Sequence, residues 1–528
     1  MKLPVGRVKG TGKQAHTYTF LAPDKAEQLK VDEFVIYELI TEHGPQPVYG
    51  RITQRQAIRL YPDAFALDPN IDPTLIAEMI GYQDAGYPLF ELTVTNIGHF
   101  NPDLRDFINP RLPPPSGCPI YLATDASLTQ VLNKRHHGEV GALQIGTLLS
   151  RPTGDVPITL DGAAITSTHL AIIASTGAGK SYLTAVLIEE LLKSNNRAAI
   201  LLIDPHNEYG TLSQLQNHPQ LKTATYNPQV TVYQPTDIKI QPSTLTLTDF
   251  IHLLPDLSEK MIFLLQRALT ELRKTPNEKM HNIRWTIPQL LETIDTITQD
   301  GALKGYSQTA TALIWRIESV LEQSGLFDDR KPLSLNHLCR VGHAAVLQLN
   351  EVKARDQQLL VATLLRRVLW ARTQTEKGRF SPHHKLYLPF PVFVIIEEAH
   401  RFAPASGDIV SSKIMKEILG EGRKFGVGMT VISQRPGKLD GDVISQCNTH
   451  CLLRIVNDVD QKRVADAVET VGKNLLSELP ALSKGQVIIA GEAVTTPILC
   501  QVRQRLTPHG AVSKNAPQAW IKVQTGHR

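Results

Sequence analysis

The chain has 528 residues, which is too many for one hydrophobic core, so two or three folded units are expected. Its hydrophobic content of 42% fills those cores and excludes a disordered protein. The 55 Lys and Arg residues against 51 Asp and Glu residues give a formal net charge of +4, a balance too small to indicate a nucleic-acid partner by itself.

Hydrophobic periodicity changes along the chain. Short β-rich runs such as EFVIYEL and LFELTVT alternate with turn residues near the N-terminus and predict a small β-barrel. Within it, the run DPTLIAEMI near Asp72 has helical spacing and predicts a short helical excursion. Later strands are apolar throughout and alternate with helices, which predicts an α/β core with a parallel sheet covered on both faces. We expect the barrel at 1–156, the core at 157–244 and 343–507, a helical insertion at 245–342, and a polar tail or arm at 508–528.

The stretch ASTGAGKSY begins at Ala174, between the apolar run HLAIIA and a helical pattern. It matches G-x-x-x-x-G-K-[ST], the phosphate-binding P-loop, at every defined position except Ala174. Lys180 is expected to reach the β- and γ-phosphates of ATP, and the Ser181 hydroxyl to ligate Mg²⁺. Glycines at 177 and 179 let backbone N–H groups curl around the phosphates. The predicted nucleotide-binding residues are Ser175, Thr176, Gly177, Ala178, Gly179, Lys180, Ser181 and Tyr182.

Three further segments end in carboxylate or amide side chains that suit ATP hydrolysis. The buried run VFVII ends in Glu397 and Glu398, which point to opposite sides if extended. Glu397 is therefore predicted on the metal side and Glu398 as the general base. Asp204 ends the run ILLID on a strand predicted to be adjacent, and is predicted to support Mg²⁺ or polarise water. Gln434 follows the strand VGMTVIS as a candidate contact of the γ-phosphate, with a simple turn as the alternative.

Two absences in the sequence exclude other kinds of protein. Neither a signal peptide nor an apolar run of about 18 residues occurs, which predicts a soluble cytoplasmic protein without a membrane segment. The five cysteines form neither an even disulfide framework nor a complete zinc site, and they are predicted to be buried thiols.

The motifs ASTGAGKS, LLIDPHNEY, VIIEEAHRFAP, EGRKFGVGMTVISQRP and CLLRIVN occur in this order. In this the chain resembles the HerA family of hexameric DNA translocases, which belong with FtsK-type motors among RecA-like P-loop ATPases. The resemblance implies a RecA-like core, an N-terminal barrel like the HAS barrel, a catalytic glutamate at Glu398, and arginines that complete the site at a subunit boundary. Arg423 in EGRKFG matches the motor-core arginine, and Arg151 matches one offered by the adjacent subunit. The alternative for Arg151 is a local ion pair with Asp155 or Asp161.

The leading hypothesis is a homohexameric ATPase, a helicase or translocase, that threads double-stranded DNA through a central pore. The resemblance implies a NurA-like nuclease or a defence effector as partner, in DNA end processing or antiviral defence. The alternative is an ATP-bound ring scaffold that assembles and activates an effector, with DNA translocation secondary. A conjugation or secretion ATPase shares the core but usually needs a membrane anchor. Arg401, Lys413 and Lys416 are candidate pore residues, or else belong to a solvated helix face.

Overall fold

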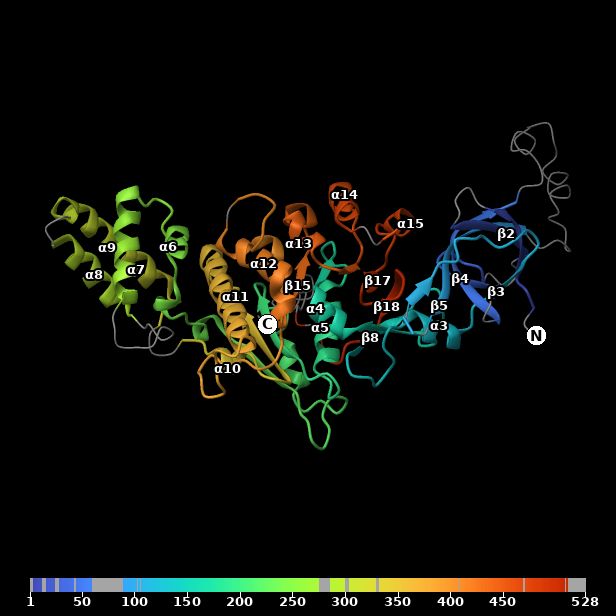
Figure 1. Cartoon of the computed structure of the whole chain (residues 1–528), viewed down its shortest axis with the longest axis horizontal. Coiled ribbons are helices and arrows are strands. Elements are labelled where there is room, and N and C mark those ends of the chain that lie inside the picture. The colour runs from blue at the N-terminus through green and yellow to red at the C-terminus, as the bar shows by residue number, and fades with distance from the viewer. Residues whose placement is uncertain are drawn as a thin grey trace, which may run out of the picture.

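The structure, a computed structural model, has three parts that lie in a row (Figure 1). A small barrel of strands lies at one end, a large sheet covered by helices lies in the middle, and a group of helices lies at the other end. The predicted helix near Asp72 and residues 511–528 of the predicted tail lie outside the described residues. The described residues are 3–11, 16–23, 28–41, 44–58, 89–101, 103–104, 106–274, 285–299, 303–328, 332–407, 409–468, 471–508 and 510.

Six strands close the N-terminal barrel, as the alternating β-rich runs predict. They follow one another in the order β2, β1, β7, β3, β4 and β5, and β2 pairs with β5 to complete the ring. Alternate side chains of β2 point inward, where Tyr18, Phe20 and Ala22 are fully buried. The elements are β1 (Gly6–Thr11), β2 (Thr17–Pro23), β3 (Phe34–Thr41), β4 (Gly44–Ala57), β5 (Leu89–Asn101), β6 (Asp106–Ile108) beside β5, β7 (Pro119–Leu122) and α3 (Asp125–Leu132).

An eleven-stranded sheet forms the middle of the molecule, in the order β12-β13-β11-β14-β15-β10-β16-β17-β18-β8-β9. The strands from β12 to β16 are parallel, and β17, β18, β8 and β9 continue the sheet with antiparallel pairs. Strand β8 lies in the segment that the sequence assigns to the barrel, but it pairs with β18 and β9 in this sheet. The strands are β8 (Ala142–Leu148), β9 (Pro157–Asp161), β10 (Leu170–Ile173), β11 (Ala199–Asp204), β12 (Gln229–Tyr233), β13 (His343–Gln348), β14 (Val392–Ile396), β15 (Val427–Ser433), β16 (Thr449–Leu452), β17 (Gln486–Gly491) and β18 (Ile498–Val502).

Hydrophobic cores cover both faces of this sheet, which explains why its central strands are apolar throughout. In β10, Leu170 and Ile172 belong to the core that contains α5, whereas Ala171 and Ile173 belong to the core that contains α11 and α12. The helices around the sheet are α4 (Gly162–Thr168), α5 (Lys180–Leu191), α10 (Leu335–Leu338), α11 (Ala354–Glu376), α12 (Val410–Glu421), α13 (Gly441–Ser445), α14 (Asp458–Ala467) and α15 (Lys473–Leu476). Short 3-10 helices are η1 (Gly210–Leu215), η2 (Pro235–Asp237), η3 (Pro242–Thr244), η4 (Lys304–Tyr306), η5 (Ala399–Arg401), η6 (Gly422–Phe425) and η7 (Pro436–Lys438).

The helical insertion has a core of its own at the end of the molecule away from the barrel (Figure 1). It contains α6 (Leu247–Leu253), α7 (Glu259–Lys274), α8 (Ile287–Gln299) and α9 (Ser307–Ser324). Leu359 of α11 joins this core, and Arg366 of α11 donates a 2.6 Å hydrogen bond to the buried carboxylate of Asp249 on α6. Helix α11 therefore links the insertion to the sheet.

Helix α5, which follows the P-loop, carries two buried carboxylates. Glu189 and Glu190 have 0% and 1% of their surface exposed, and Arg503, just after β18, pairs with both at 2.9 and 2.8 Å. Glu189 also accepts hydrogen bonds from the backbone N–H groups of Leu506 and Thr507. The segment after β18 is thereby held against the P-loop helix.

Replacing Arg503 with Met is expected to lower the free energy of unfolding by about 3 kcal/mol, because Glu189 would stay buried without its cation. Chemical denaturation, followed by circular dichroism, measures this loss. The matched control is Arg135→Met, which removes a more exposed ion pair with Asp161 at 3.2 Å and should cost less than about 1 kcal/mol. Equal losses for the two variants would show that the buried pair contributes no special stability.

Candidate nucleotide site

The P-loop connects β10 to α5 at the carboxyl edge of the parallel strands. Gly177 and Gly179 have φ values of 79° and 110°, in the left-handed region that glycine favours. Gly179 caps α5 without a side chain, so the first N–H groups of the helix can point toward an anion. Ala174, at the end of the strand, is fully buried, so the methyl group that departs from the P-loop pattern packs in the core. The loop geometry therefore fits phosphate binding.

Lys180 lies among three carboxylates that come from distant parts of the chain. Its Nζ contacts Glu397 and lies 3.3 Å from Glu398 Oε1 and 3.8 Å from Glu208 Oε2. Burial disfavours the ammonium charge, but these carboxylates outweigh burial and raise the pKa of Lys180. Burial also raises the pKa of Glu397 to about 7, and Lys180 opposes that shift. The predicted phosphate-binding lysine and the predicted acidic pair thus meet in one site.

The two glutamates after β14 do not point to opposite sides, and the expectation of an extended pair is wrong. The strand ends at Ile396, and Glu398 has φ 53° and ψ 45°, a left-handed conformation that is unusual for a residue other than glycine. The turn brings both carboxylates to Lys180. Sequence periodicity predicts side-chain direction only while the strand continues.

Glu398 is almost fully buried, and one of its oxygens accepts no hydrogen bond from the described residues. His400 Nδ1 lies 3.2 Å from Glu398 Oε2 without hydrogen-bond geometry, so this oxygen has no hydrogen-bond partner among the described residues. Burial lowers the pKa of His400, although the nearby carboxylate of Glu398 opposes the shift. His400 also lies 3.2 Å from Ser433 Oγ at the end of β15. A carboxylate oxygen that accepts no hydrogen bond can take a proton from water when water enters the site.

Asp204 ends β11 as predicted, but its carboxylate is occupied by the loop that follows. It accepts hydrogen bonds from the backbone N–H groups of His206, Glu208 and Tyr209 at 3.4, 3.1 and 3.1 Å. Strand β11 is the parallel neighbour of β14, which carries the acidic pair, whereas β14 and β15 separate it from β10. The structure therefore places Asp204 under the loop, and a metal contact of its own stays a prediction.

The same loop supplies two site residues that the sequence did not reveal. Glu208 accepts a hydrogen bond from Ser181 Oγ, the hydroxyl predicted to ligate Mg²⁺. Tyr209 is fully buried and donates a 2.6 Å hydrogen bond to Glu397 Oε2. Both belong to the motif LLIDPHNEY, but their roles depend on a turn that places them beside α5 and β14, which no local pattern indicates.

Gln434 lies at the P-loop, where Thr176 Oγ1 donates a 2.8 Å hydrogen bond to its side-chain oxygen. This contact joins the end of β15 to the loop after β10, because the two strands are parallel neighbours. The position is suitable for contact with a γ-phosphate, and that role stays a prediction.

The two predicted arginines lie outside this site. Arg423 is exposed in η6, before β15, and therefore at the opposite edge of the sheet from the P-loop. Strand β15 has seven residues, which separates the two edges by about 20 Å at the rise of about 3.3 Å per residue. An arginine at that distance does not reach the phosphate site of its own chain.

Arg151 is held within its own chain, but not by the local acids that the sequence suggested. Its guanidinium donates to Glu33 Oε1 at 2.8 and 3.1 Å, to Asp125 Oδ1 at 2.8 Å and to the carbonyl of Ala123 at 2.8 Å. Asp161 pairs with Arg135 instead. Glu33 lies at the start of barrel strand β3, so Arg151 links the sheet to the barrel.

The remaining candidate features lie apart from the P-loop. Lys416 of α12 pairs with Asp440 at 2.5 Å, whereas Lys413 is exposed.

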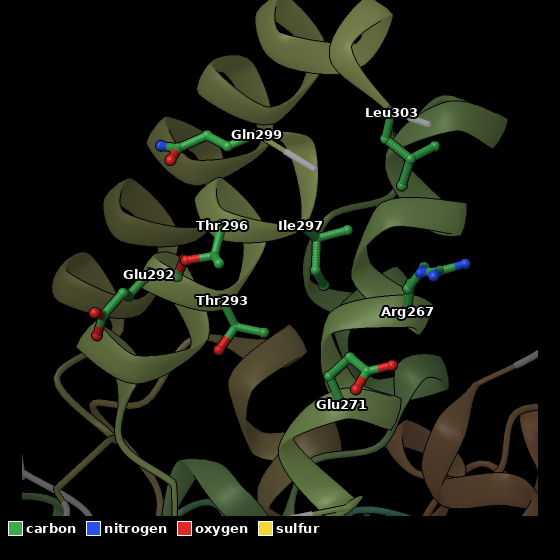
Figure 2. Close-up of a pocket in the computed structure, with 8 residues that line it drawn as sticks. All are labelled: Arg267, Glu271, Glu292, Thr293, Thr296, Ile297, Gln299 and Leu303. Atoms are coloured by element: carbon green, nitrogen blue, oxygen red, sulfur yellow. The ribbon is translucent and has the colours of Figure 1, made fainter. Parts of the chain in front are cut away.

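All five cysteines are free thiols, and four of them are buried. An open groove of about 830 Å³ lies between α7 and α8 in the insertion, and none of the predicted site residues lines it. Figure 2 shows the residues that line this groove. In the part of the chain that the structure describes, no helix is long and apolar enough to cross a membrane.

Comparisons with known proteins agree with this geometry. A family described as "Helicase HerA, central domain" matches residues 143–368, which include the P-loop and Asp204. The DNA double-strand break repair helicase HerA of Sulfolobus acidocaldarius is 27% identical over 498 residues, 92% of each chain. The protein of the same name from Pyrococcus furiosus is 29% identical over 437 residues, 75% of each chain.

A solved structure shows a similar fold. VirB4 of Thermoanaerobacter pseudethanolicus has a TM-score of 0.51 and 15% identity, over 70% of this chain and 97% of that one. The closed barrel and the α/β sheet with its P-loop confirm the predicted fold class. From the P-loop and the acidic pair after β14, together with these comparisons, we conclude that the chain is an ATPase whose residues 143–368 match the central domain of HerA helicases and which is similar to HerA helicases over three quarters or more of its length.

Proposed function

We propose that six copies of the chain form a cytoplasmic ring that uses ATP and Mg²⁺ to move along double-stranded DNA, as a translocase or helicase. The observation that carries this proposal is the meeting of Lys180 with Glu397 and Glu398 beside the P-loop. These are the charges that phosphoryl transfer to water requires. DNA as the substrate is supported by the names of the relatives, which are DNA double-strand break repair helicases.

Each residue of the site has a separate role in this proposal. Lys180 turns from the carboxylates to the β- and γ-phosphates of ATP, while Glu398 accepts the proton of the attacking water. Ser181 Oγ and the Glu397 carboxylate are hard oxygen donors, which fit Mg²⁺. The ion would supply neutralisation of the charge on the phosphate oxygens. Gln434 would contact the γ-phosphate from the end of β15.

Arginines from the neighbouring subunit are proposed to complete each site. Arg423 is exposed and too far from its own P-loop, so a role in trans fits its position better than a role in cis. For Arg151 the same role requires the guanidinium to leave Glu33 and Asp125 when the ring forms. A guanidinium at the γ-phosphate stabilises the charge of the transition state, and it would couple hydrolysis to the position of the neighbour.

A nuclease like NurA or a defence effector is the proposed partner, in DNA end processing or antiviral defence. The barrel is the proposed docking surface, because it lies at the end of the molecule opposite the insertion (Figure 1). Its segment exposes Ile40, Leu104 and Leu112, with 87%, 67% and 66% of their surface accessible.

The purified chain is expected to form a six-membered ring in native mass spectrometry, and double-stranded DNA should raise its ATPase rate severalfold. The physical reason is that a ring places an arginine from each neighbour at each site and grips the DNA phosphates in its pore. Lys180→Ala serves as the inactive control. A monomer at micromolar concentration with ATP and DNA present would contradict the ring. A ring whose ATPase responds only to the partner protein would favour the scaffold alternative.

A further inference from the structure

We propose that Glu208 is a positioning residue on the metal side of the ATP site, where it orients a water bound to Mg²⁺. This inference rests on the proposed use of Mg–ATP, but it concerns a residue to which neither the motifs nor the family resemblance gives a role. Three features of the loop after β11 carry it: the way the loop is held, the atoms that Glu208 contacts, and the exposure of its carboxylate.

The loop from Pro205 to Tyr209 is fixed at both of its ends. Asp204 accepts three backbone hydrogen bonds from the loop, and its carboxylate is fully buried beneath it. At the other end, the Tyr209 hydroxyl donates to Glu397, the metal-side carboxylate of the proposed site. The side chain between these two anchors, Glu208, is thus held in place by folded structure, as a residue that orients others must be.

Glu208 contacts the two P-loop side chains that are expected to change partners when nucleotide binds. It accepts a hydrogen bond from Ser181 Oγ and lies 3.8 Å from Lys180 Nζ. In the proposed complex, Lys180 turns to the phosphates and the lone pairs of Ser181 Oγ face the metal. Glu208 would then lie beside the hydroxyl that holds the ion, where its carboxylate could accept a hydrogen bond from a metal-bound water.

Exposure separates the roles of Glu208 and Glu397. Both oxygens of Glu397 are engaged, one with Lys180 and one with Tyr209, and its side chain is fully buried. The side chain of Glu208 is 23% exposed, so water reaches it without the cost of opening the core. Mg²⁺ dehydrates reluctantly and keeps several waters in its shell, and those waters need oriented acceptors. Glu208 is the carboxylate at this site that is open to such a water.

The test is a Mg²⁺ titration of the binding of a fluorescent ATP analogue to the full-length chain, without DNA. Glu208→Gln is expected to raise the Mg²⁺ concentration needed for half-maximal binding by about tenfold to a hundredfold, the usual effect of losing a residue that orients the metal shell. In EDTA the same variant should bind the analogue as tightly as the wild type or more tightly, because one negative charge near the triphosphate is gone. Glu208→Asp should lie between the two.

His206→Ala is the matched control, since His206 lies on the same loop and its side chain is exposed. It should leave the Mg²⁺ titration unchanged. An unchanged titration in Glu208→Gln would overturn the proposal, and so would an equal shift in His206→Ala, because the effect would then belong to the loop in general. Lys180→Ala distinguishes an error in the nucleotide site from an error in the role of Glu208. If that variant still binds the analogue, the nucleotide site itself is wrong, whereas loss of binding in Lys180→Ala beside a normal Glu208→Gln overturns only the role of Glu208.

Discussion

Lys180→Ala is expected to abolish ATP binding and turnover, whereas Glu398→Gln should bind ATP normally and hydrolyse it about a thousandfold more slowly. The difference follows from what each side chain contacts. Lys180 supplies the positive charge for the phosphates, while Glu398 has an oxygen that accepts no hydrogen bond from the described residues and is proposed to take the proton of water. Nucleotide binding by fluorescence and phosphate release in a single turnover measure the two effects separately.

The structure adds a control to this experiment. Removing Lys180 leaves Glu397 and Glu398 buried without their cation, and breaking a buried pair in this way costs about 3–5 kcal/mol of stability. The double variant Lys180→Met with Glu397→Gln removes the ammonium charge and the carboxylate charge nearest to it, and it should recover part of the lost unfolding temperature but not ATP binding. Turnover near the wild-type rate in Lys180→Ala and Glu398→Gln would refute the site. A stably folded double variant that still binds ATP would show that Lys180 only neutralises the buried carboxylates and does not bind the phosphates.

The sequence predicts the elements of this molecule better than it predicts the contacts between them. The run LAII of β10, the P-loop and α5 follow one another within 22 residues, and each has a local pattern of apolar side chains, glycines or helical spacing. The barrel is recognisable for the same reason, because its inward residues alternate along each strand. Local chemistry decides where such elements begin and end.

The site contacts that the sequence missed join residues far apart along the chain. Tyr209 meets Glu397 across 188 positions, and Arg151 meets Glu33 across 118. The sequence offered Asp155 and Asp161 for Arg151 only because they are near in the chain, whereas the folded partner lies on the barrel. The left-handed turn at Glu398 and the loop that presents Glu208 have no periodic pattern either. Such positions are recognised only when the sheet order is known.

Arg423→Ala is expected to leave the ring assembled and ATP bound but to slow hydrolysis by about a thousandfold, the usual effect of losing an arginine supplied across an interface. The structure favours this outcome because Arg423 is exposed at the edge of the sheet opposite its own P-loop. Lys424→Ala is the matched control, since Lys424 is its exposed neighbour in η6 and should leave the rate within a factor of about two.

Mixed rings test whether the arginine acts across the boundary. Subunits with Arg423→Ala keep an intact P-loop and subunits with Lys180→Ala keep an intact arginine, so rings of both contain some boundaries with every part present. ATPase activity should reappear in the mixture. As a control, a chain that carries both Arg423→Ala and Lys180→Ala should restore no activity when it is mixed with either single variant. If Arg423 served its own subunit, no boundary would be complete and the mixture would stay inactive.

The same mixture made with Arg151→Ala separates the two roles that the structure leaves to that residue. Under the proposed trans role, the arginine leaves Glu33 and Asp125 when the ring forms, and its mixed rings regain activity with Lys180→Ala. If Arg151 only ties the barrel to the sheet, every subunit that carries Arg151→Ala loses the buried ion pair with Glu33. Those rings would stay as slow as unmixed Arg151→Ala, and their barrel would unfold at a lower temperature. Glu33→Gln distinguishes the two further, because it should release a trans arginine and preserve hydrolysis, but should weaken the tie as Arg151→Ala does.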